Sequence, residues 1–390
     1  MNRYLLVTVG ILIAVGTVVR SGELSLDAQR ELLVTYGVLT GQIDADQLER
    51  LGVTLPEMEL PIKCGTPLVM TFWEYRDRFD KQLMQSLGVV GRPVRPSLDQ
   101  QYGSPAGRFL IHYTKTGSNA CFQPTVDSDN DGTPDYIESI GVIADSVWDN
   151  TIQGLKYPAP PSDSFYPDGG DYRYDIYLRN EGGQFFGLTF GDSIIQNDAL
   201  AAHSTSFMEL DNDYQERTFS QYNSRPLDAA RVTIAHEFFH SIHFAMDFRE
   251  NEAVDNDNPR QYWMEMSATW MEEQLYDDIN DYYTVLKFFF DDPGNSIQQF
   301  KSFADLHPYG SMLFALYLSE NYGPNIINVI WQLCENLGPG PSFLVAADSA
   351  IKIASGGSAT FQTSFSEFAL WNFFTGNRSD LLPAGVDGYP

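Results

Sequence analysis

Basic residues are scarce in this chain. Lys and Arg total 24, against 52 Asp and Glu, and the formal net charge is −28. A field of that sign repels a phosphate backbone or an anionic membrane surface, so nucleic acid is not expected as a partner. The excess of carboxylates is explained by a solubilising surface or by sites that bind cations.

Cysteine is scarcer still, with Cys64, Cys121 and Cys334 alone among 390 residues. An odd count this low permits at most one internal disulfide, so packing rather than cross-linking must hold the fold together. Three interpretations of Cys64 stay open. It forms a disulfide with Cys121, it is a plain buried thiol, or its thiolate occupies the zinc of an inactive precursor.

Long apolar runs are also rare. The run Leu5–Val19 has 15 residues between Arg3 and Arg20, fewer than the roughly 20 that span a bilayer, and no later segment is longer or more apolar. The pattern of residues 1–21 therefore predicts a secretory signal peptide. The protein is expected to be secreted or extracellular, with no transmembrane span after signal removal. Because no A-x-A cleavage site is visible, an uncleaved anchor is the alternative.

Apolar and aromatic residues are plentiful, at 43% and 14%, which is enough for a sizeable globular core. After the signal peptide we expect a helical or propeptide-like region at residues 22–97. A stretch rich in Pro and Gly at residues 91–107 marks its end. A catalytic domain is then expected at residues 98–390.

Residue patterns within the catalytic domain predict an α+β fold in which a sheet precedes a mostly helical half. Side chains of β-forming type alternate in three short stretches, and helical periodicity dominates from Asp228 onward. The expected strands are residues 108–114, 172–178 and 206–210. The expected helical blocks after the one that begins at Asp228 are residues 262–275, 279–290, 309–321, 324–337 and 364–374.

The motif that carries chemistry is HEFFH at residues 236–240, an HExxH pattern in a helix that begins near Pro226. Histidines at i and i+4 lie on one helical face, so both imidazoles can reach one zinc ion at about 2.0–2.1 Å. Glu237 lies beside that ion, where a carboxylate can take a proton from water as general base.

A catalytic zinc usually has three protein ligands, so one more is needed beside His236 and His240. Glu265 follows 25 residues after the second histidine, in a stretch that predicts a helix, and supplies that carboxylate. Glu272 and Glu273 compete for the role. Since Glu272 lies about 10 Å further along the same helix, one ion is not expected to use both.

His243 is a further rival, because it shares a helical face with His236 at i+7. It lies about 10 Å along the helix, and no glycine turns the chain back toward the ion there. We therefore interpret His243 as a packing residue or as a group that orients a ligand.

Residues 127–138 match the calcium-binding loop of an EF-hand, with Gly at the sixth position. The predicted ligands are Asp127, Asp129, Asp131, the Thr133 carbonyl, Asp135 and Glu138. A full pair of flanking helices is not visible. The pattern therefore predicts a calcium ion with a structural role, not a calcium sensor.

HEFFHSIHF followed by WMEMSATWMEE resembles the gluzincin clan of zinc metallopeptidases, whose third ligand is a downstream helical Glu. GRFLIHYTKTGSNA, DSDNDGTPDYIE, HPYGSMLFALYL and FALWNFFTG are similar to stretches of secreted bacterial proteins of metalloprotease type. The match is specific at residues 228–275 and spans about residues 61–378. It implies a zincin-like fold, zinc on the three ligands named above, and Glu237 as general base and acid. His243 departs from the pattern.

Amide hydrolysis also needs a donor to the oxyanion. His307 and Tyr309 precede a helix and can each donate a hydrogen bond; packing is the more ordinary interpretation of both, and the resemblance favours Tyr309. The expected function is a secreted zinc metalloendopeptidase acting on proteins or peptides. One alternative is a calcium-stabilised extracellular binding or adhesion protein with an idle zinc site. The other is a zinc hydrolase of non-peptide amides or esters. The intact Glu237 favours an enzyme.

Overall fold

The computed structural model describes residues 24–53, 62–91, 93–165, 170–198, 200–248, 261–301, 305–337 and 343–375, with Arg378 and Leu381. The expected signal peptide, residues 1–21, lies outside these ranges. Among the helices of the described ranges, none combines the length and the apolar character that a membrane crossing needs.

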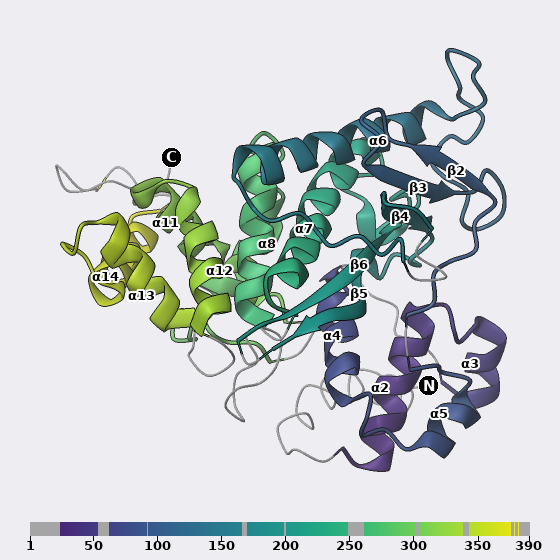
Figure 1. Ribbon diagram of the computed structural model, residues 1–390, viewed down its shortest axis with the longest axis horizontal. Coiled ribbons are helices and arrows are strands. Elements are labelled where there is room, and N and C mark those ends of the chain that lie inside the picture. The colour runs from purple at the N-terminus through teal and green to yellow at the C-terminus, as the bar shows by residue number, and fades with distance from the viewer. Residues whose placement is uncertain are drawn as a thin grey trace.

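Helices pack on a single mixed sheet formed by the described strands, so the expected α+β class is confirmed (Figure 1). In spatial order the strands are β1 (Ile62–Cys64), β5 (Phe185–Asn197), β6 (Ala202–Asp211), β4 (Tyr174–Arg179), β3 (Phe109–Tyr113) and β2 (Gln100–Gly103). Two pairs, β2 with β3 and β5 with β6, are antiparallel. The other neighbours pair in parallel.

The three expected strands correspond to β3, β4 and β6, whereas β1, β2 and β5 were not predicted. In β5, every residue from Phe185 to Gly191 is buried. A strand buried on both faces lacks the alternation of apolar and polar residues by which a half-buried strand is recognised. β1 is only three residues long, too short to leave a pattern.

The N-terminal unit, which we define as residues 24–53 and 62–91, covers one face of the sheet (Figure 1). Its helices are α2 (Leu26–Leu39), α3 (Ala45–Leu51), α4 (Thr66–Tyr75) and α5 (Lys81–Leu87). Their apolar side chains form one cluster with Tyr177, Leu188 and Phe207 of the sheet. The region expected to be helical thus also contributes β1, which joins it to the rest of the fold.

The opposite face of the sheet carries α6 (Asp135–Trp148) and α7 (Pro226–Asp247). Ile176 and Leu178 point to this side, while the intervening Tyr177 points to the other, as strand alternation requires. In α7, every residue from Val232 to Asp247 is buried. Such a helix carries its polar side chains into the core, where each needs a partner.

The remaining helices extend the molecule away from the sheet (Figure 1). They are α8 (Gln261–Tyr276), α9 (Leu286–Phe290), α10 (His307–Gly310), α11 (Met312–Tyr322), α12 (Asn325–Leu337), α13 (Phe343–Ala354) and α14 (Phe361–Phe373). The single block expected at residues 279–290 is a 3₁₀ turn, Asp281–Thr284, followed by α9. α13 was not predicted, because Gly and Pro before it and Gly after it are typical of loops.

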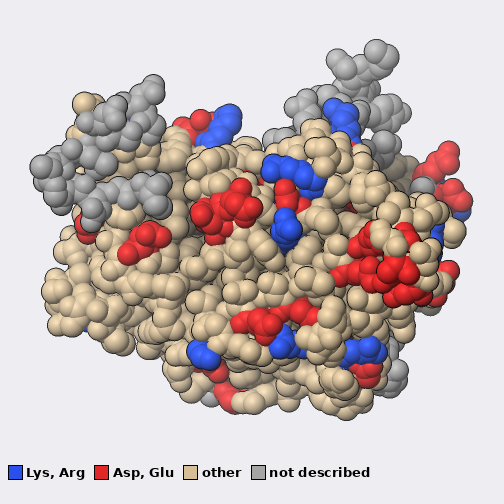
Figure 2. Space-filling model, turned by 90° about the horizontal axis from the view of Figure 1, so that it is seen from above, with Lys and Arg blue, Asp and Glu red and all other residues tan. Residues whose placement is uncertain are grey.

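Acidic side chains dominate the charged surface on the face shown in Figure 2, where Asp and Glu gather in patches, the largest of them at the right of the view. This distribution matches the formal charge of −28. Carboxylates of one sign keep a protein soluble but repel one another, so bound cations are favourable partners for such a surface.

Candidate metal centre

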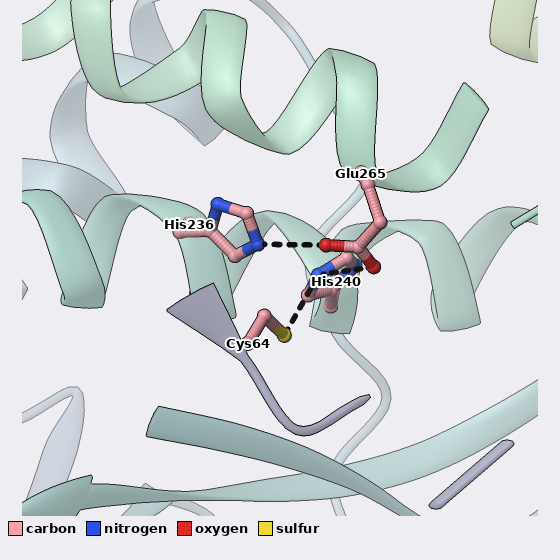
Figure 3. A group of neighbouring side chains, drawn as sticks. All are labelled: Cys64, His236, His240 and Glu265. Atoms are coloured by element: carbon pink, nitrogen blue, oxygen red, sulfur yellow. Dashed lines mark hydrogen bonds and ion pairs between the residues drawn. The ribbon is translucent and has the colours of Figure 1, made fainter. Parts of the chain in front are cut away.

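Two helices bring three predicted ligands together (Figure 3). His236 and His240 lie one turn apart on α7, and Glu265 faces them from α8. His236 Nε2 lies 3.2 Å from Glu265 Oε2, and His240 Nε2 lies 3.3 Å from Glu265 Oε1. The HExxH spacing therefore directs both Nε2 atoms at one carboxylate, as neighbouring turns of a helix allow.

A fourth donor comes from the N-terminal unit. Cys64, the last residue of β1, points to the same spot, and its Sγ lies 3.5 Å from His240 Nε2. Each of these side chains offers one donor atom, and the atoms all lie within 4.8 Å of one another. We call Cys64, His236, His240 and Glu265 the ligand group.

The spacing of the ligand group fits a small tetrahedral ion. Ligand atoms about 2.0–2.3 Å from a tetrahedral zinc are themselves about 3.3–3.7 Å apart. Three of the six separations in the ligand group are 3.2, 3.3 and 3.5 Å, and all six are within 4.8 Å. Thiolate, imidazole and carboxylate are also the donor types that zinc accepts. The residues present thus fit such an ion in number, chemistry and spacing.

One interpretation of Cys64 is wrong. A disulfide between Cys64 and Cys121 does not form, because both are free and buried thiols. Burial raises the pKa of the Cys64 thiol well above its usual value, and the charges of nearby carboxylates raise it further. A metal-free Cys64 is therefore a neutral thiol, which an ion would have to deprotonate.

The ligand group is closed off from solvent, since none of its residues exposes more than 2% of its surface. Burial lowers the pKa of His236, but hydrogen bonds to Glu265 and Glu272 outweigh it and raise that pKa to about 10. Burial likewise raises the pKa of Glu265, but His240 and His236 bring it down to about 2. In the metal-free protein, protonated His236 and ionised Glu265 therefore pair with each other.

Glu272 holds the other nitrogen of His236. Its Oε1 lies 2.7 Å from His236 Nδ1, and its Oε2 accepts a hydrogen bond of 2.7 Å from Lys63 Nζ. Lys63 also forms a buried ion pair with Asp281. Burial lowers the pKa of Lys63, but Asp281 and Glu272 raise it above its ordinary value. Glu272 is thus positioned to orient His236 and not to share an ion with Glu265.

His243 lies behind His240, on the side of Nδ1. The two Nδ1 atoms are 3.3 Å apart, and His243 Nε2 lies 3.2 Å from Ser267 Oγ. The ring of His243 stacks on Trp331 with 4.1 Å between centroids. Burial, together with the two neighbouring histidines, lowers the pKa of His243 well below its usual value. This position suits packing and orientation of His240, since His240 turns its other nitrogen to the ligand group.

Glu237 is fully buried on α7, next to the ligand group. Its Oε2 accepts hydrogen bonds from Thr66 Oγ1 at 3.0 Å and Thr189 Oγ1 at 2.8 Å. Its Oε1 has no hydrogen-bond partner among the described residues. A small cavity with room for about one water molecule adjoins Glu237, beside Lys63 and Glu272, and His236 is the one member of the ligand group among its described lining residues. A buried carboxylate oxygen that lacks a donor is well suited to accept a proton from a water.

The two expected oxyanion donors are placed differently. The ring of Tyr309 stacks on His236 with 6.0 Å between centroids, and its buried hydroxyl lies near Glu265. Burial raises the pKa of Tyr309 well above its usual value, and Glu265 raises it further, so the hydroxyl keeps its proton. His307 faces its own helix, with Nδ1 3.3 Å from Ser311 Oγ. Tyr309 therefore neighbours the ligand group, and His307 contacts Ser311.

Residues 127–138, which we call the acidic loop, form a second group of carboxylates. Asp127, Asp129 and Asp131 each place one oxygen within 4.8 Å of the others. Gly132 N donates to Asp127 Oδ2 at 2.9 Å, and its φ of +100° is a conformation that favours glycine. The backbone of the loop thus holds three of the predicted ligands in one place.

The other predicted ligands of the acidic loop have their own contacts. Asp135, the first residue of α6, accepts hydrogen bonds from Ser128 N at 2.7 Å and Ser128 Oγ at 2.5 Å. Thr133 N donates to Asp131 Oδ1 at 2.7 Å. Burial and the charges of the loop aspartates raise the pKa of Glu138. The charges of the loop aspartates thus act on Glu138, whereas Asp135 is engaged with Ser128.

Sequence reasoning missed the groups that come from far along the chain. Lys63 is 209 residues from Glu272, and Thr66 is 171 residues from Glu237. Thr189 is 48 residues from Glu237. No spacing rule links residues so far apart. Cys64 offered one hint in the sequence, because a zinc ligand at that position would also bring its neighbours Lys63 and Thr66 to the site.

A third acidic group was not predicted either. Asp211 ends β6, Asp213 and Glu216 follow it, and the three place one carboxylate oxygen each within 4.8 Å of the others. Burial raises the pKa of Asp211 to about 7, and the charge of Glu216 contributes. The sequence DNDYQE carries these carboxylates at a spacing unlike that of a calcium loop.

Three members of the ligand group lie on helices within one continuous stretch of chain. Residues 215–338 match a family of unknown function, DUF6055. This stretch contains α7 and α8, whereas Cys64 and the rest of the N-terminal unit precede it. No curated protein and no solved structure matches the chain. The inference of a function therefore rests on the geometry of the site.

Proposed function

We propose that this protein is a secreted zinc metalloendopeptidase of the gluzincin type, with a zincin-like catalytic fold. His236, His240 and Glu265 bind the zinc ion, and Glu237 is the general base. One observation carries the proposal: the Nε2 atoms of an HExxH helix lie 3.2 and 3.3 Å from the oxygens of a single carboxylate on the next helix. These distances fit the spacing of ligands around zinc.

The residues around that group support the chemistry of amide hydrolysis. Zinc bound there supplies Lewis-acid polarisation of the scissile carbonyl and of the attacking water. Glu237 accepts a proton from the water at Oε1, the oxygen without a donor, and returns it to the leaving amine. Thr189 fixes the other oxygen of Glu237 and so gives Oε1 a defined direction. The protonated hydroxyl of Tyr309 is available to donate to the oxyanion.

The acidic loop supports a second part of the proposal, a calcium ion with a structural role. Three carboxylates from Asp127, Asp129 and Asp131 are already close together, and their charges act on Glu138. Hard cations such as calcium take several oxygen ligands of this kind. Calcium would also relieve the repulsion among carboxylates, which adds to burial in raising the pKa of Glu138.

The test is hydrolysis of a denatured protein by purified chains. Wild type and Cys64→Ala are each compared with the same chain carrying Glu237→Gln, because Cys64 lies where a water would have to bind. We expect hydrolysis in the Cys64→Ala chain, and a fall of about 10²–10⁴-fold when Glu237→Gln is added. The zinc content should not change, since Glu237 is not a ligand. Glu273→Gln is the matched control and should keep full activity.

Equal rates with and without Glu237→Gln would contradict the proposal, as would activity that survives removal of zinc by a chelator. The rival candidate, a binding protein with an idle zinc site, is favoured by the fourth donor, because closed four-ligand sites are structural. It predicts bound zinc and no hydrolysis in any of the chains. A zinc hydrolase of non-peptide amides or esters would lose activity with Glu237→Gln only on those substrates.

A further inference from the structure

The ligand group has one donor more than a catalytic zinc requires. Catalytic zinc usually has three protein ligands and one open position, while structural zinc has four protein ligands. Here the fourth donor, Cys64 Sγ, is as close to His240 Nε2 as ligands of one ion are to each other. It comes from the N-terminal unit and not from α7 or α8.

The contacts of Cys64 belong to a set made by one short piece of chain, residues 62–66, which we call the inserted segment. Thr66 N donates to Cys64 Sγ at 3.3 Å, which is the type of contact that stabilises a thiolate. Thr66 Oγ1 donates to Glu237, and Lys63 Nζ donates to Glu272. The inserted segment thus makes three contacts with the site. Cys64 joins the ligand group, Thr66 binds the general base, and Lys63 binds the carboxylate that orients His236.

The sheet holds the inserted segment in place. β1 pairs in parallel with β5, with Ile62 opposite Phe185 and Cys64 opposite Gly187. Gly65 then passes so close to β5 that a Cβ at this position would lie 2.3 Å from Leu188 Cδ2. Because Leu188 is itself fully buried and has little room to move, a larger residue at position 65 is expected to push the segment away from the strand.

The inserted segment also explains why the site is sealed. Glu237 and His240 are fully buried, and a peptide substrate cannot reach a base or a metal that is closed off from solvent. α4 begins at Thr66, the last residue of the segment, and its residues Leu68 and Phe72 are buried in the cluster beneath the sheet. Packing of the N-terminal unit therefore keeps the segment in the site.

We propose that Cys64 Sγ is the fourth ligand of the zinc ion, and that the N-terminal unit thereby holds the enzyme inactive until the inserted segment leaves. This inference rests on the proposed function. On release, the bond between sulfur and metal breaks, the thiolate takes a proton from solvent, and water enters the vacated position. Thr66 leaves Glu237 in the same movement, so the fourth position on the zinc and the general base become available together.

The first measurement identifies the ligand without using activity. X-ray absorption at the zinc edge of the full chain should show one sulfur neighbour at about 2.3 Å beside nitrogen and oxygen neighbours at about 2.0–2.1 Å. The sulfur signal should be lost in Cys64→Ala and retained in Cys121→Ala, a substitution of another buried cysteine. Zinc with only nitrogen and oxygen neighbours in the wild-type chain would overturn the proposal.

The second measurement tests inhibition. Cys64→Ala opens the fourth position, and Gly65→Ala keeps the thiol but displaces the inserted segment. Both should hydrolyse a denatured protein faster than the wild type, by about tenfold or more. Gly91→Ala is the matched control in the same unit, because a Cβ there would meet no atom closer than 3.6 Å, and it should leave the rate unchanged. Equal rates for all four chains would overturn the proposal.

The two proposals fail in different ways. A wild-type chain that binds zinc without sulfur and hydrolyses protein in a Glu237-dependent manner would overturn the inference about Cys64 and leave the proposed function standing. A chain whose zinc is bound through Cys64 but whose Cys64→Ala and Gly65→Ala forms hydrolyse nothing would overturn both. If Gly65→Ala does not fold, the absorption spectrum and the Cys64→Ala assay still decide the outcome.

Discussion

The ligand group and the acidic loop are both recognised from short motifs, but they are built in opposite ways. The ligand group is buried and joins residues as far apart as Cys64 and His240, 176 positions along the chain. The acidic loop is largely exposed and takes its carboxylates from consecutive turns of one loop. The first depends on the whole fold, whereas the second depends mainly on its own backbone.

The difference lies in what happens when the ion is absent. Buried charges in the ligand group then pair with one another, as the opposite pKa shifts of His236 and Glu265 show. Carboxylates of the acidic loop remain hydrated and repel each other. Losing a ligand from the buried group should therefore have a large, local effect on metal binding. Losing calcium should have a smaller effect, which is a lower thermal stability of the whole chain.

The largest effect is expected from His240→Ala, which should abolish stoichiometric zinc binding and leave calcium binding intact. His240 Nε2 faces both Glu265 and Cys64, so its loss removes the centre of the group. Elemental analysis of the purified chain measures both metals. His243→Ala is the control, since its ring lies behind His240, and most zinc should remain. Equal loss of zinc in both variants would make His243 a ligand.

Glu272→Gln should weaken zinc binding by about 10–100-fold, the usual cost of losing a partner that orients a histidine ligand. Glu272 Oε1 lies 2.7 Å from His236 Nδ1, and the amide keeps the shape but not the charge. Competition with a chromophoric chelator gives the affinity. Glu273→Gln, one position along the same helix, should have no effect, and a matching loss there would assign the effect to the helix as a whole.

Calcium removal should lower the melting temperature by a few degrees while zinc stays bound. An ion that binds only the folded chain stabilises it by about 2.7 kcal/mol at a hundredfold excess over its dissociation constant. Thermal unfolding with and without a chelator selective for calcium measures the shift. A melting temperature that does not change would count against calcium in the acidic loop.

The smallest expected effect is a difference in calcium affinity between variants of two aspartates in the acidic loop. Asp129→Asn should raise the dissociation constant for calcium by about tenfold, which corresponds to about 1.4 kcal/mol. Asp135→Asn should change it less, because both oxygens of Asp135 already accept hydrogen bonds from Ser128. Calorimetric titration with calcium compares the two. A larger effect at Asp135 would mean that the loop rearranges around the ion.

Local patterns account for what could be predicted from the sequence. His236 and His240 share a face because they are one helical turn apart, and Glu265 lies in a stretch, residues 262–275, that was expected to be a helix. Three strands and most of the later helices were recognised in the same way. In the acidic loop, the positions of Asp127, Asp129 and Asp131 follow from a loop whose geometry is set by its own residues.

Long-range contacts account for what could not be predicted. β5 is buried on both faces, so its sequence shows no alternation of apolar and polar residues, and β1 is recognised as a strand only from its pairing with β5. Whether Cys64 was a disulfide, a plain thiol or a ligand depended on which residues lie across the sheet. Lys63 and Thr66 acquire their roles through the same pairing, and no spacing in the sequence records it.

The ion pair between Lys63 and Asp281 closes a loop of 218 positions, which has a consequence for the order of folding. Closing so long a loop costs chain entropy, and contacts distant in sequence slow the folding of a domain. The helices of the N-terminal unit can form as soon as they are synthesised. The inserted segment, by contrast, can dock only after α7, α8 and Asp281 are in place. We therefore expect zinc binding through Cys64 to appear in the last kinetic phase of refolding, after the rest of the fold has formed.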